Sequence, residues 1–255
     1  MKNGVTNILW TSGWDSTFRL AELVLIKGKT VQPYYVLDER RPSSRIELQK
    51  MEEIKQLLIT KDSSTRNKIL PTIMSRASQV PPNEQVSKSL QVLKQQSHIG
   101  DQYDFLARFA LHHNIRNLEL SIHKDDMAHG FLKDYVHSFS DKEGNVSYEM
   151  SKESCPVELH VIFSHFSFPV FEKTKLEMDA YAHQNDFQDI MEITWFCHKP
   201  LLNNKPCGFC RPCQYTRQEG LGRRVPDATI GARLEYHYAR AIRKIKSVFK
   251  VSLYS

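Results

Sequence analysis

The sequence of 255 residues contains no apolar run that approaches the roughly 18 residues needed by a membrane-spanning helix. The apolar core of a secretory signal peptide is also missing, because Met1 to Gly4 lead directly into a short strand-like segment. We therefore expect a cytoplasmic protein that does not cross a membrane.

The composition of a disordered chain is absent as well. Hydrophobic residues make up 40% of the sequence and charged residues 25%, so enough apolar side chain is present to form a core. The 35 lysines and arginines outnumber the 29 aspartates and glutamates, which gives a formal net charge of +6. This excess is compatible with a phosphate-bearing ligand or a nucleic acid, but solvated lysines would give the same value.

Cysteines are few, and their distribution argues against a disulfide framework. There are five, an odd number, and four of them lie close together in the last third of the chain. Their spacing can close a tetrahedral shell of thiolates around Zn²⁺, with Gly208 permitting the tight turn and no position left for water. An iron–sulfur cluster, a redox-active pair and a contribution from His198 are alternatives, and Cys155 is expected to be an isolated structural thiol. The predicted ligands of this structural zinc site are Cys197, Cys207, Cys210 and Cys213.

Short apolar segments alternate with segments of helical periodicity along most of the chain. Such alternation predicts an α/β fold, a doubly wound parallel sheet of five strands with helices on both faces. Ligands of such sheets bind beyond the carboxyl ends of the strands. The polar stretch 75–97 is predicted to be a long loop or a broken helix. The expected strands are 5–10, 31–37, 68–73, 118–122 and 166–171, and the expected helices include 16–27, 45–59 and 101–113.

The sheet is assigned to residues 1–195, and residues 196–255 are expected to pack on it as a cysteine-rich turn followed by basic helices. Apolar residues recur at helical intervals from Ile230 to Val248, which predicts a packed terminal helix. Its basic side chains could form a nucleic-acid face, although charges on a helix are usually solvated. These basic residues are Arg233, Arg240, Arg243, Lys244 and Lys246.

A turn of small residues lies where the first strand meets the first helix. Its backbone can approach an anion closely, the first N–H groups of the helix point at that anion, and the Ser16 and Thr17 hydroxyls can donate further hydrogen bonds. Asp15 would repel a bare phosphate, so it indicates either a bridging Mg²⁺ ion or a helix N-cap. The turn reads Trp10-Thr11-Ser12-Gly13-Trp14-Asp15-Ser16-Thr17.

Together, the turn and the cysteine motif resemble the PP-loop ATP pyrophosphatase family and, within it, the QueC-like branch. Residues 11–16 stand where the family has Ser-Gly-Gly-x-Asp-Ser, and the four cysteines match the QueC-type zinc knuckle in place and order. The resemblance covers most of the chain. It implies that residues 10–17 bind ATP with Mg²⁺ and that Asp15, Ser16 and a nearby cation are catalytic. Lys173 is the candidate for that cation, with a solvated lysine at a helix start as the alternative.

The resemblance also implies a reaction. Members of the family use ATP to convert a carboxylate into an acyl-adenylate with loss of pyrophosphate, and an amine then displaces AMP. In the QueC branch, ammonia attacks an activated deazapurine carboxylate, and a second activation dehydrates the amide to a nitrile. We therefore expect an ATP-dependent carbon–nitrogen ligase, forming a homodimer, whose small-molecule partners are ATP and a carboxylated deazapurine.

The sequence departs from the family in ways that affect the substrate pocket. Ser12 places a side chain where the family has glycine, and the residues after the fourth strand differ from those that usually hold the deazapurine. A helix-capping acidic turn is the alternative interpretation of that segment. The residues expected to bind substrate are Gly100, Gln102, His123, Asp125 and Asp126.

These departures leave further functions open. A close variant of the ligase would pass the deazapurine to a protein or nucleic-acid amine, as in QueC-like members of bacterial modification and defence systems. A protein of the same fold could instead bind tRNA through its basic C-terminal helix, with strongly salt-dependent affinity. The third alternative is a catalytically silent subunit in which Ser12 closes the ATP loop.

Overall fold

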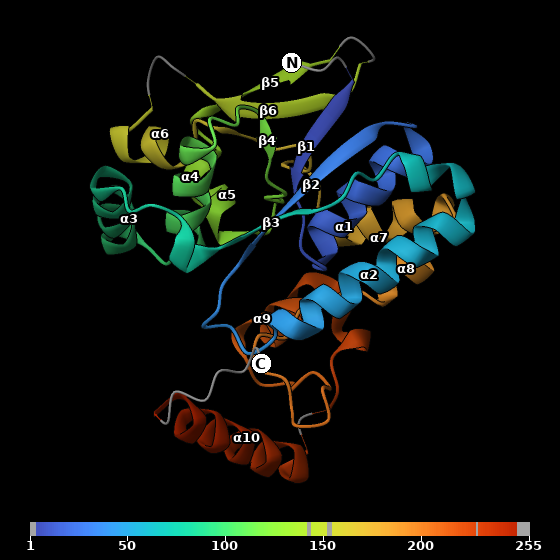
Figure 1. Ribbon diagram of the computed structural model, residues 1–255, viewed down its shortest axis with the longest axis vertical. Coiled ribbons are helices and arrows are strands. Elements are labelled where there is room, and N and C mark those ends of the chain that lie inside the picture. Colours follow the sequence, from blue (N-terminus) through green and yellow to red (C-terminus); the bar gives the residue numbers. More distant parts are fainter. Residues whose placement is uncertain (1–3, 142–143, 152–154, 228, 249–255) are drawn as a thin grey trace.

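A sheet of seven strands in the order β3-β2-β1-β4-β7-β6-β5 forms the centre of the molecule (Figure 1). The computed structural model describes residues 4–141, 144–151, 155–227 and 229–248. Strands β3, β2, β1, β4 and β7 run parallel, and β6 and β5 continue the sheet in antiparallel pairing. The strands are β1 (Val5–Leu9), β2 (Thr30–Leu37), β3 (Ile73–Arg76), β4 (Leu118–Glu119), β5 (Val136–Ser140), β6 (Val146–Met150) and β7 (Phe166–Ser167).

The α/β class and the parallel core were predicted, but the predicted number of five strands is wrong. The two additional strands, β5 and β6, form a hairpin at one edge of the sheet. All five residues of β5 are exposed or half-buried, so this strand lacks the buried apolar residues that strands such as β1 and β2 contain. The third strand was placed too early. It begins at Ile73, whereas Ile69 forms only an isolated bridge with Val31.

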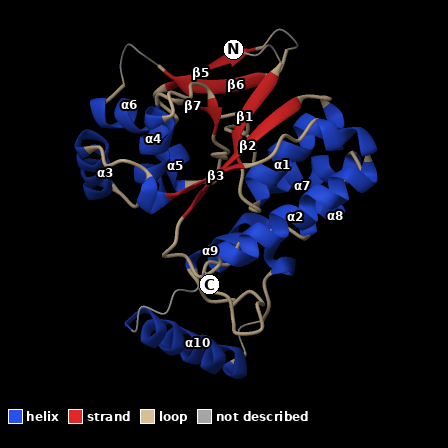
Figure 2. Cartoon of the chain, in the orientation of Figure 1, coloured by secondary structure: helices blue, strands red, loops and turns tan. Residues whose placement is uncertain are grey.

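Helices cover both faces of the sheet (Figure 2), as a doubly wound arrangement requires. Successive residues of β1 point to opposite faces, so that Ile8 packs into one apolar layer and Leu9 into the other. The layer around Ile8 contains α1 (Trp14–Ala21), its π-helical continuation η1 (Glu22–Ile26), α2 (Ser44–Lys61), α7 (Lys175–Gln184) and α8 (Gln188–Glu192). The layer around Leu9 contains α3 (Glu84–Gln96), α4 (Gln102–His112), α5 (Met127–Leu132) and α6 (Val157–Phe163).

Helix α3 corrects the prediction of a loop or broken helix in this region. Asn83 caps it, because its Oδ1 accepts a hydrogen bond of 3.0 Å from the Val86 N–H. Val86, Leu90 and Leu93 are buried on one face at helical spacing. The two prolines lie before the cap, so they end the preceding loop and do not interrupt the helix.

The C-terminal part continues through α9 (Arg211–Thr216), η4 (Arg217–Leu221), η5 (Gly222–Arg224) and α10 (Ile230–Val248), which lies apart from the sheet in Figure 1. The expectation that the apolar face of α10 is packed is wrong for its first turns. Ile230, Leu234 and Tyr238 are 82%, 67% and 62% exposed, because α10 contacts the cysteine-rich segment through a neighbouring face that includes buried Ala239. Two of the basic residues serve this packing, since Arg243 donates to the Pro200 carbonyl and Arg233 lies over Phe209. The side chains of Lys244 and Lys246 lie outside the described part.

A buried ion pair connects α1 to β4 beneath the carboxyl ends of the strands. The Arg19 guanidinium donates two hydrogen bonds, of 2.7 and 2.6 Å, to the Glu119 carboxylate and a third of 2.7 Å to Glu22. We expect Arg19→Ala to lower the free energy of unfolding by about 3 to 5 kcal/mol, because it leaves the buried Glu119 carboxylate without its Arg19 partner, whereas Glu22 keeps its ion pair with Lys27 at 3.1 Å. Denaturant unfolding measures this loss. Lys88→Ala, which breaks an exposed pair with Glu84, is the control and should cost about 1 kcal/mol or less; equal losses would contradict the prediction.

Among the helices of the described residues, none is both long and apolar enough to cross a membrane.

Candidate functional site

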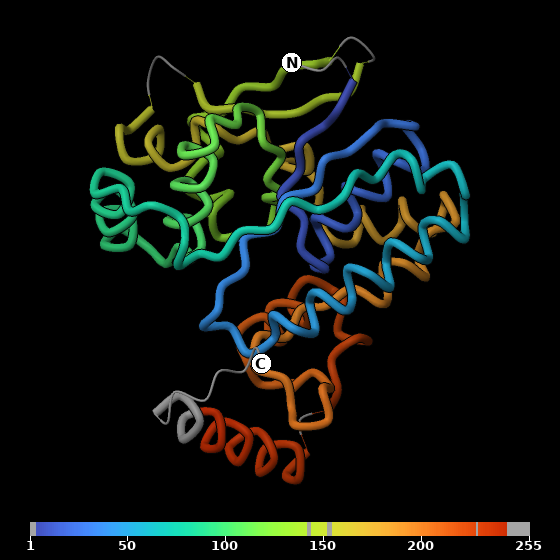
Figure 3. Tube along the Cα trace, viewed as in Figure 1, coloured from blue at the N-terminus to red at the C-terminus, as the bar shows by residue number. Residues whose placement is uncertain are grey.

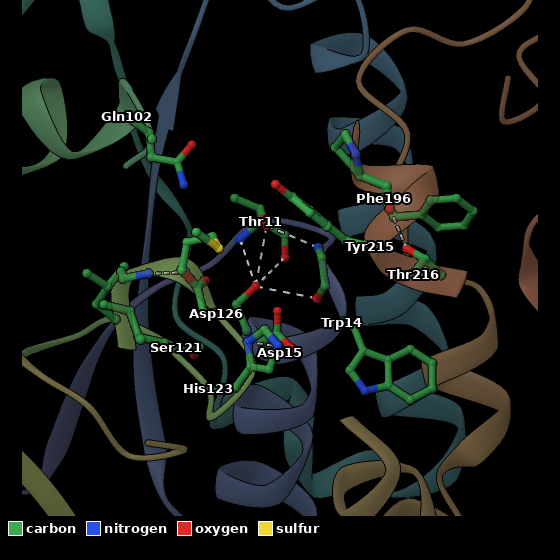
Figure 4. A pocket seen from close by; sticks show the side chains of 18 of the residues that line it. Thr11, Trp14, Asp15, Gln102, Ser121, His123, Asp126, Phe196, Tyr215 and Thr216 are labelled. Atoms are coloured by element: carbon green, nitrogen blue, oxygen red, sulfur yellow. Dashed lines mark hydrogen bonds and ion pairs between the residues drawn. The ribbon is translucent and has the colours of Figure 1, made fainter. Parts of the chain in front are cut away.

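A cavity of about 1020 Å³ opens beyond the carboxyl ends of β1 and β4. From β1 the chain proceeds to β2 and β3 on one side, and it later returns to β4 and β7 on the other side. The loops that follow β1 and β4 therefore diverge, and this is the position where doubly wound sheets bind ligands. Figure 4 shows the cavity between a wall with Gln102, Ser121 and Asp126 and a wall with Phe196 and Tyr215.

Most of the predicted site residues meet in this cavity. The described lining includes eleven of them, from both the first turn and the expected substrate-binding segments. Ser12, Thr17 and Lys173 are missing from it. The predicted residues that line the cavity are Trp10, Thr11, Gly13, Trp14, Asp15, Ser16, Gly100, Gln102, His123, Asp125 and Asp126.

The start of α1 presents free donors to the cavity. Gly13 is the N-cap, and no described side chain caps the helix. The N–H groups of the first turn therefore remain free to donate hydrogen bonds. The loop is held by its own side chains, because Thr11 N donates to Ser16 Oγ at 3.3 Å and Gly13 N donates to Thr11 Oγ1 at 3.0 Å. Helix capping by Asp15 or Ser16, the alternative from the sequence, is therefore not the arrangement found. The arrangement can bind an anion.

Ser12 and Thr17 are turned into the protein. Ser12 is fully buried, and its carbonyl accepts a hydrogen bond of 2.7 Å from Trp195 N. Thr17 Oγ1 accepts one of 3.2 Å from the Trp10 indole. The Ser12 side chain therefore leaves the cavity side of the loop open, and Thr17 contributes to the packing of the loop.

Four charged or titratable side chains meet beside the loop. His123 lies between two carboxylates, with Nδ1 3.7 Å from Asp15 Oδ1 and Nε2 3.6 Å from Glu219 Oε1. The Lys175 ammonium lies 2.7 Å from Glu219 Oε2 and 3.8 Å from Asp15 Oδ2. These residues come from α1, the loop after β4, the start of α7 and η4, so the fold assembles the cluster from four distant segments.

Burial and mutual charge set the protonation of this cluster. Burial raises the pKa of a carboxyl, but the neighbouring His123 and Lys175 outweigh it and lower the pKa of Glu219 to about 2. Burial disfavours the charged forms of His123 and Lys175, yet Asp15 and Glu219 outweigh it and raise the pKa of both. The side chains therefore favour the state in which cations and anions alternate.

The lysine beside the loop at the start of α1 is Lys175 and not the predicted Lys173. The Lys173 ammonium lies over the Tyr181 ring, 5.9 Å from its centroid, whereas Lys175 lines the cavity. Thr174 separates the two and caps α7 in a reciprocal capping box with Glu177. Glu219 was not anticipated at all, because it belongs to no recognised motif and approaches the loop only through the tertiary fold.

The residues expected to bind substrate occupy one wall of the cavity. Asp126 caps α5, since its Oδ1 accepts a hydrogen bond of 2.8 Å from Ala128 N, and burial raises its pKa. This confirms capping for Asp126, while Asp125 is exposed at the rim. Ser121 Oγ and both ring nitrogens of His123 are buried and lack a hydrogen-bond partner among the described residues. Such groups normally bond to water or ligand, so this wall has polar capacity available for a ligand.

The opposite wall is aromatic and is held by Arg224. Its guanidinium carbon lies 4.8 Å from the centroid of a Trp14 ring and 5.3 Å from that of Phe196. Arg224 also donates a hydrogen bond of 2.7 Å to Thr194 Oγ1, and burial lowers its pKa to about 10. The wall therefore combines aromatic rings with a buried guanidinium that lines the cavity.

The four predicted cysteines converge on one point next to the cavity. Their sulfur atoms all lie within 4.8 Å of one another, and four of the distances are 3.4 to 3.8 Å. Gly208 adopts a φ of +76°, as the tight turn requires, and a Cβ there would lie 3.0 Å from the Pro226 carbonyl. Ile46 and Trp195 belong to the apolar cluster around the sulfurs. The cysteine-containing segment lies beside the start of α2 (Figure 3). The cluster could hold a metal ion and is compatible with zinc.

Acidification should expose the contribution of Glu219 to stability. A carboxyl with a lowered pKa stabilises the folded state above its ordinary value near 4.5, and this contribution is lost as the pH falls toward about 2. We expect Glu219→Gln to cost about 3 kcal/mol of unfolding free energy near neutral pH. The difference from wild type should shrink between pH 4.5 and 2. Urea unfolding across this pH range measures the difference. The control is Glu84→Gln, whose side chain is 80% exposed. A difference that does not change with pH would contradict the prediction.

Comparison with known proteins identifies no relative of this chain. No family model matches it, and no curated protein matches it. The geometry of the cavity and the cysteine cluster therefore carries the functional argument.

Proposed function

We propose that the protein is a QueC-like, AMP-forming ligase that adenylates a 7-deazaguanine-type carboxylate with ATP and transfers it to ammonia or another amine. The observation that carries this proposal is the start of α1, which opens without a side-chain cap onto a large cavity at the switch point of the sheet. This arrangement suits the phosphates of a nucleotide, because helix N–H groups and the helix dipole favour negative charge there.

The loop at the start of α1 and the neighbouring Lys175 then have tasks in adenylation. The carboxylate oxygen of the substrate attacks the α-phosphorus, and pyrophosphate leaves with the electron pair of the broken bond. The α1 N–H groups, Ser16 and Lys175 would stabilise the charge that develops on the phosphate oxygens. The resulting acyl-adenylate would then react with the amine at its carbonyl carbon, and AMP would leave.

Asp15 is the residue that would hold Mg²⁺. Its Oδ1 atom is buried, faces the cavity cluster and has no hydrogen-bond partner among the described residues, as expected of an oxygen reserved for a ligand. Carboxylate oxygen is a preferred ligand of Mg²⁺. When bound, the ion would neutralise phosphate charge.

We further propose that the cysteine cluster holds structural zinc. A tetrahedron with Zn–S bonds of about 2.3 Å has edges of about 3.8 Å, close to the sulfur–sulfur distances of 3.4 to 3.8 Å. Backbone N–H groups of Cys207 and Cys210 point at the sulfurs of Cys197 and Cys207 at 3.2 Å, which stabilises thiolates. With four protein ligands the site leaves no position for a reacting water.

The test is an assay of pyrophosphate release with ATP, Mg²⁺ and 7-carboxy-7-deazaguanine, with and without ammonium, followed by mass spectrometry of the products. AMP with an amide or nitrile product supports the proposal, and Asp15→Ala should reduce the rate about 100-fold. The control is Asp189→Ala, which removes a 55% exposed carboxylate outside the described cavity lining and should leave the rate unchanged. Absence of ATP turnover with every carboxylate supplied would overturn the proposal and favour a silent or nucleic-acid-binding protein.

A protein or nucleic-acid amine is the second candidate acceptor, and the size of the cavity favours it. Its volume of about 1020 Å³ is at the upper end of ligand pockets, which span roughly 300 to 1,000 Å³. A nucleotide and a heterocycle would therefore leave room for an extended amine. AMP formation without amide or nitrile, together with a deazapurine mass added to a supplied acceptor, would identify this variant. If the deazapurine mass is found only in small molecules when such acceptors are supplied, this variant is excluded.

A further inference from the structure

A hydrogen bond joins the segment that follows the cysteines to the turn between Cys207 and Cys210. Arg217, the first residue of η4, donates hydrogen bonds of 2.7 Å to the Gly208 carbonyl and to the Pro226 carbonyl. Gly208 lies inside the turn between Cys207 and Cys210. The position of η4 therefore depends on the conformation of the metal-binding turn.

The same segment is fitted tightly against the start of α7. Gly220 adopts a φ of +85°, and a Cβ at this position would lie 2.6 Å from Leu176 Cδ2. Glycine suits this position because its φ lies in the left-handed region that residues with a side chain rarely adopt, and the Leu176 side chain would have to move to admit a Cβ. Glu219, which precedes Gly220, is thereby delivered to Lys175, and both side chains are nearly buried at 12% and 13% exposure.

Glu219 is the carboxylate partner that Lys175 and His123 share. The Lys175 side chain has four rotatable carbon–carbon bonds and would spread over many rotamers without a partner. Its strongest described contact is the 2.7 Å ion pair with Glu219 Oε2. The His123 ring, 3% exposed, has no described hydrogen bond at either nitrogen and faces Glu219 Oε1 at 3.6 Å. The Glu219 carboxylate thus faces both the Lys175 ammonium and the His123 ring, and both groups also face Asp15.

We infer that Glu219 is a positioning residue through which the metal-binding segment fixes Lys175 and His123 at the nucleotide loop. The cysteine cluster then does more than hold the C-terminal part together, because its turn sets the geometry of the site through Arg217 and η4. The inference rests on the proposed function in one respect, the assumption that Lys175 faces phosphates. The placement of Lys175 by Glu219 can be tested without any nucleotide.

The first experiment measures how fast an amine-selective acetylating reagent modifies Lys175 in the metal-loaded, full-length protein, with peptide mass spectrometry as the readout. Glu219→Gln should accelerate this modification about tenfold, because a hydrogen bond between charged groups contributes a factor of ten or more. Glu219→Asp, which keeps the charge, should give an intermediate rate. Lys68, which donates to the Val24 carbonyl at 3.3 Å, is the internal reference and should not change.

Glu192→Gln is the matched control. It removes a carboxylate that pairs with Arg223 at 2.6 Å and with Arg224 at 3.6 Å but does not itself line the described cavity. If Glu192→Gln accelerates Lys175 modification as much as Glu219→Gln does, or if neither does, the inference is overturned.

Metal removal tests the link to the cysteine cluster. A chelator should increase Lys175 modification in wild type and add little in Glu219→Gln, because both changes release the same contact. Additive effects would contradict the link. In the pyrophosphate assay, Glu219→Gln should lower turnover about 100-fold, as expected for a displaced reacting group, and Glu219→Asp should lower it less. If wild type releases no pyrophosphate, the proposed function fails, while the modification rates still decide the role of Glu219.

Discussion

Lys175→Ala is expected to reduce ATP-dependent pyrophosphate release by about 100- to 1,000-fold, the range typical for removal of one preorganised donor to a developing negative charge. Lys175 lines the cavity, and its pKa is raised because Asp15 and Glu219 outweigh the effect of burial, so it carries a proton at neutral pH. An ammonium held in this way can stabilise phosphate charge without reorganising during the reaction. Lys175→Arg retains the charge but lengthens the side chain, so we expect intermediate activity.

Lys173→Ala is the matched control, because it removes an ammonium two residues away that lies over Tyr181. We expect this variant to keep nearly full activity. Since Lys175→Ala leaves Glu219 without its ion-pair partner, the thermal stability of both variants has to be measured alongside their rates. A larger loss of activity in Lys173→Ala than in Lys175→Ala would contradict the assignment and return Lys173 to the site.

The features that local sequence could predict are those determined by spacing or periodicity. The cysteine cluster follows from the spacing of four ligands within 17 residues, and the five parallel strands from short apolar runs between amphipathic helices. Strands β5 and β6 were not predicted, because an edge hairpin needs little buried apolar surface. Val146 of β6, for example, remains 50% exposed. The apolar period of α10 predicted a packed helix, yet a helical period cannot show whether a partner surface covers the face.

The charged cluster of the site shows the same limit. Asp15 was named from the turn of small residues between the first strand and the first helix. His123 was named from the segment after the fourth strand, which departs from the family pattern. The choice between Lys173 and Lys175 depends on where α7 begins, and the Thr174 to Glu177 capping box places that start at Lys175. This signal was present in the sequence. Glu219 had no such signal, because its approach to Lys175 depends on the π-helical turn η4 and on Gly220 packing against Leu176.

Cys210→Ser is expected to abolish stoichiometric metal binding and to destabilise the protein by several kcal/mol. Structural zinc contributes its binding free energy to folding, and apparent values for small zinc domains are about 10 to 16 kcal/mol. The apolar residues around the sulfurs, such as Leu201 and Val225, form a small cluster that includes the cysteines themselves. Without the metal, Cys210→Ser would leave three buried thiols and one serine hydroxyl at the centre of that cluster. Metal analysis and denaturant unfolding measure the two effects.

Cys155→Ser is the control for thiol loss, because Cys155 is half-buried and lies outside the four-sulfur cluster. It should retain metal and nearly all stability. We expect about one zinc ion per wild-type chain. Iron with sulfide and visible absorption would instead identify an iron–sulfur cluster. If metal-free wild type and Cys210→Ser were equally stable, the sulfurs would serve packing alone. Because Trp195 N donates to the Ser12 carbonyl at 2.7 Å, Cys210→Ser should also loosen the loop before α1. If this loop binds nucleotide as proposed, the activity of the variant should fall even at temperatures where it remains folded.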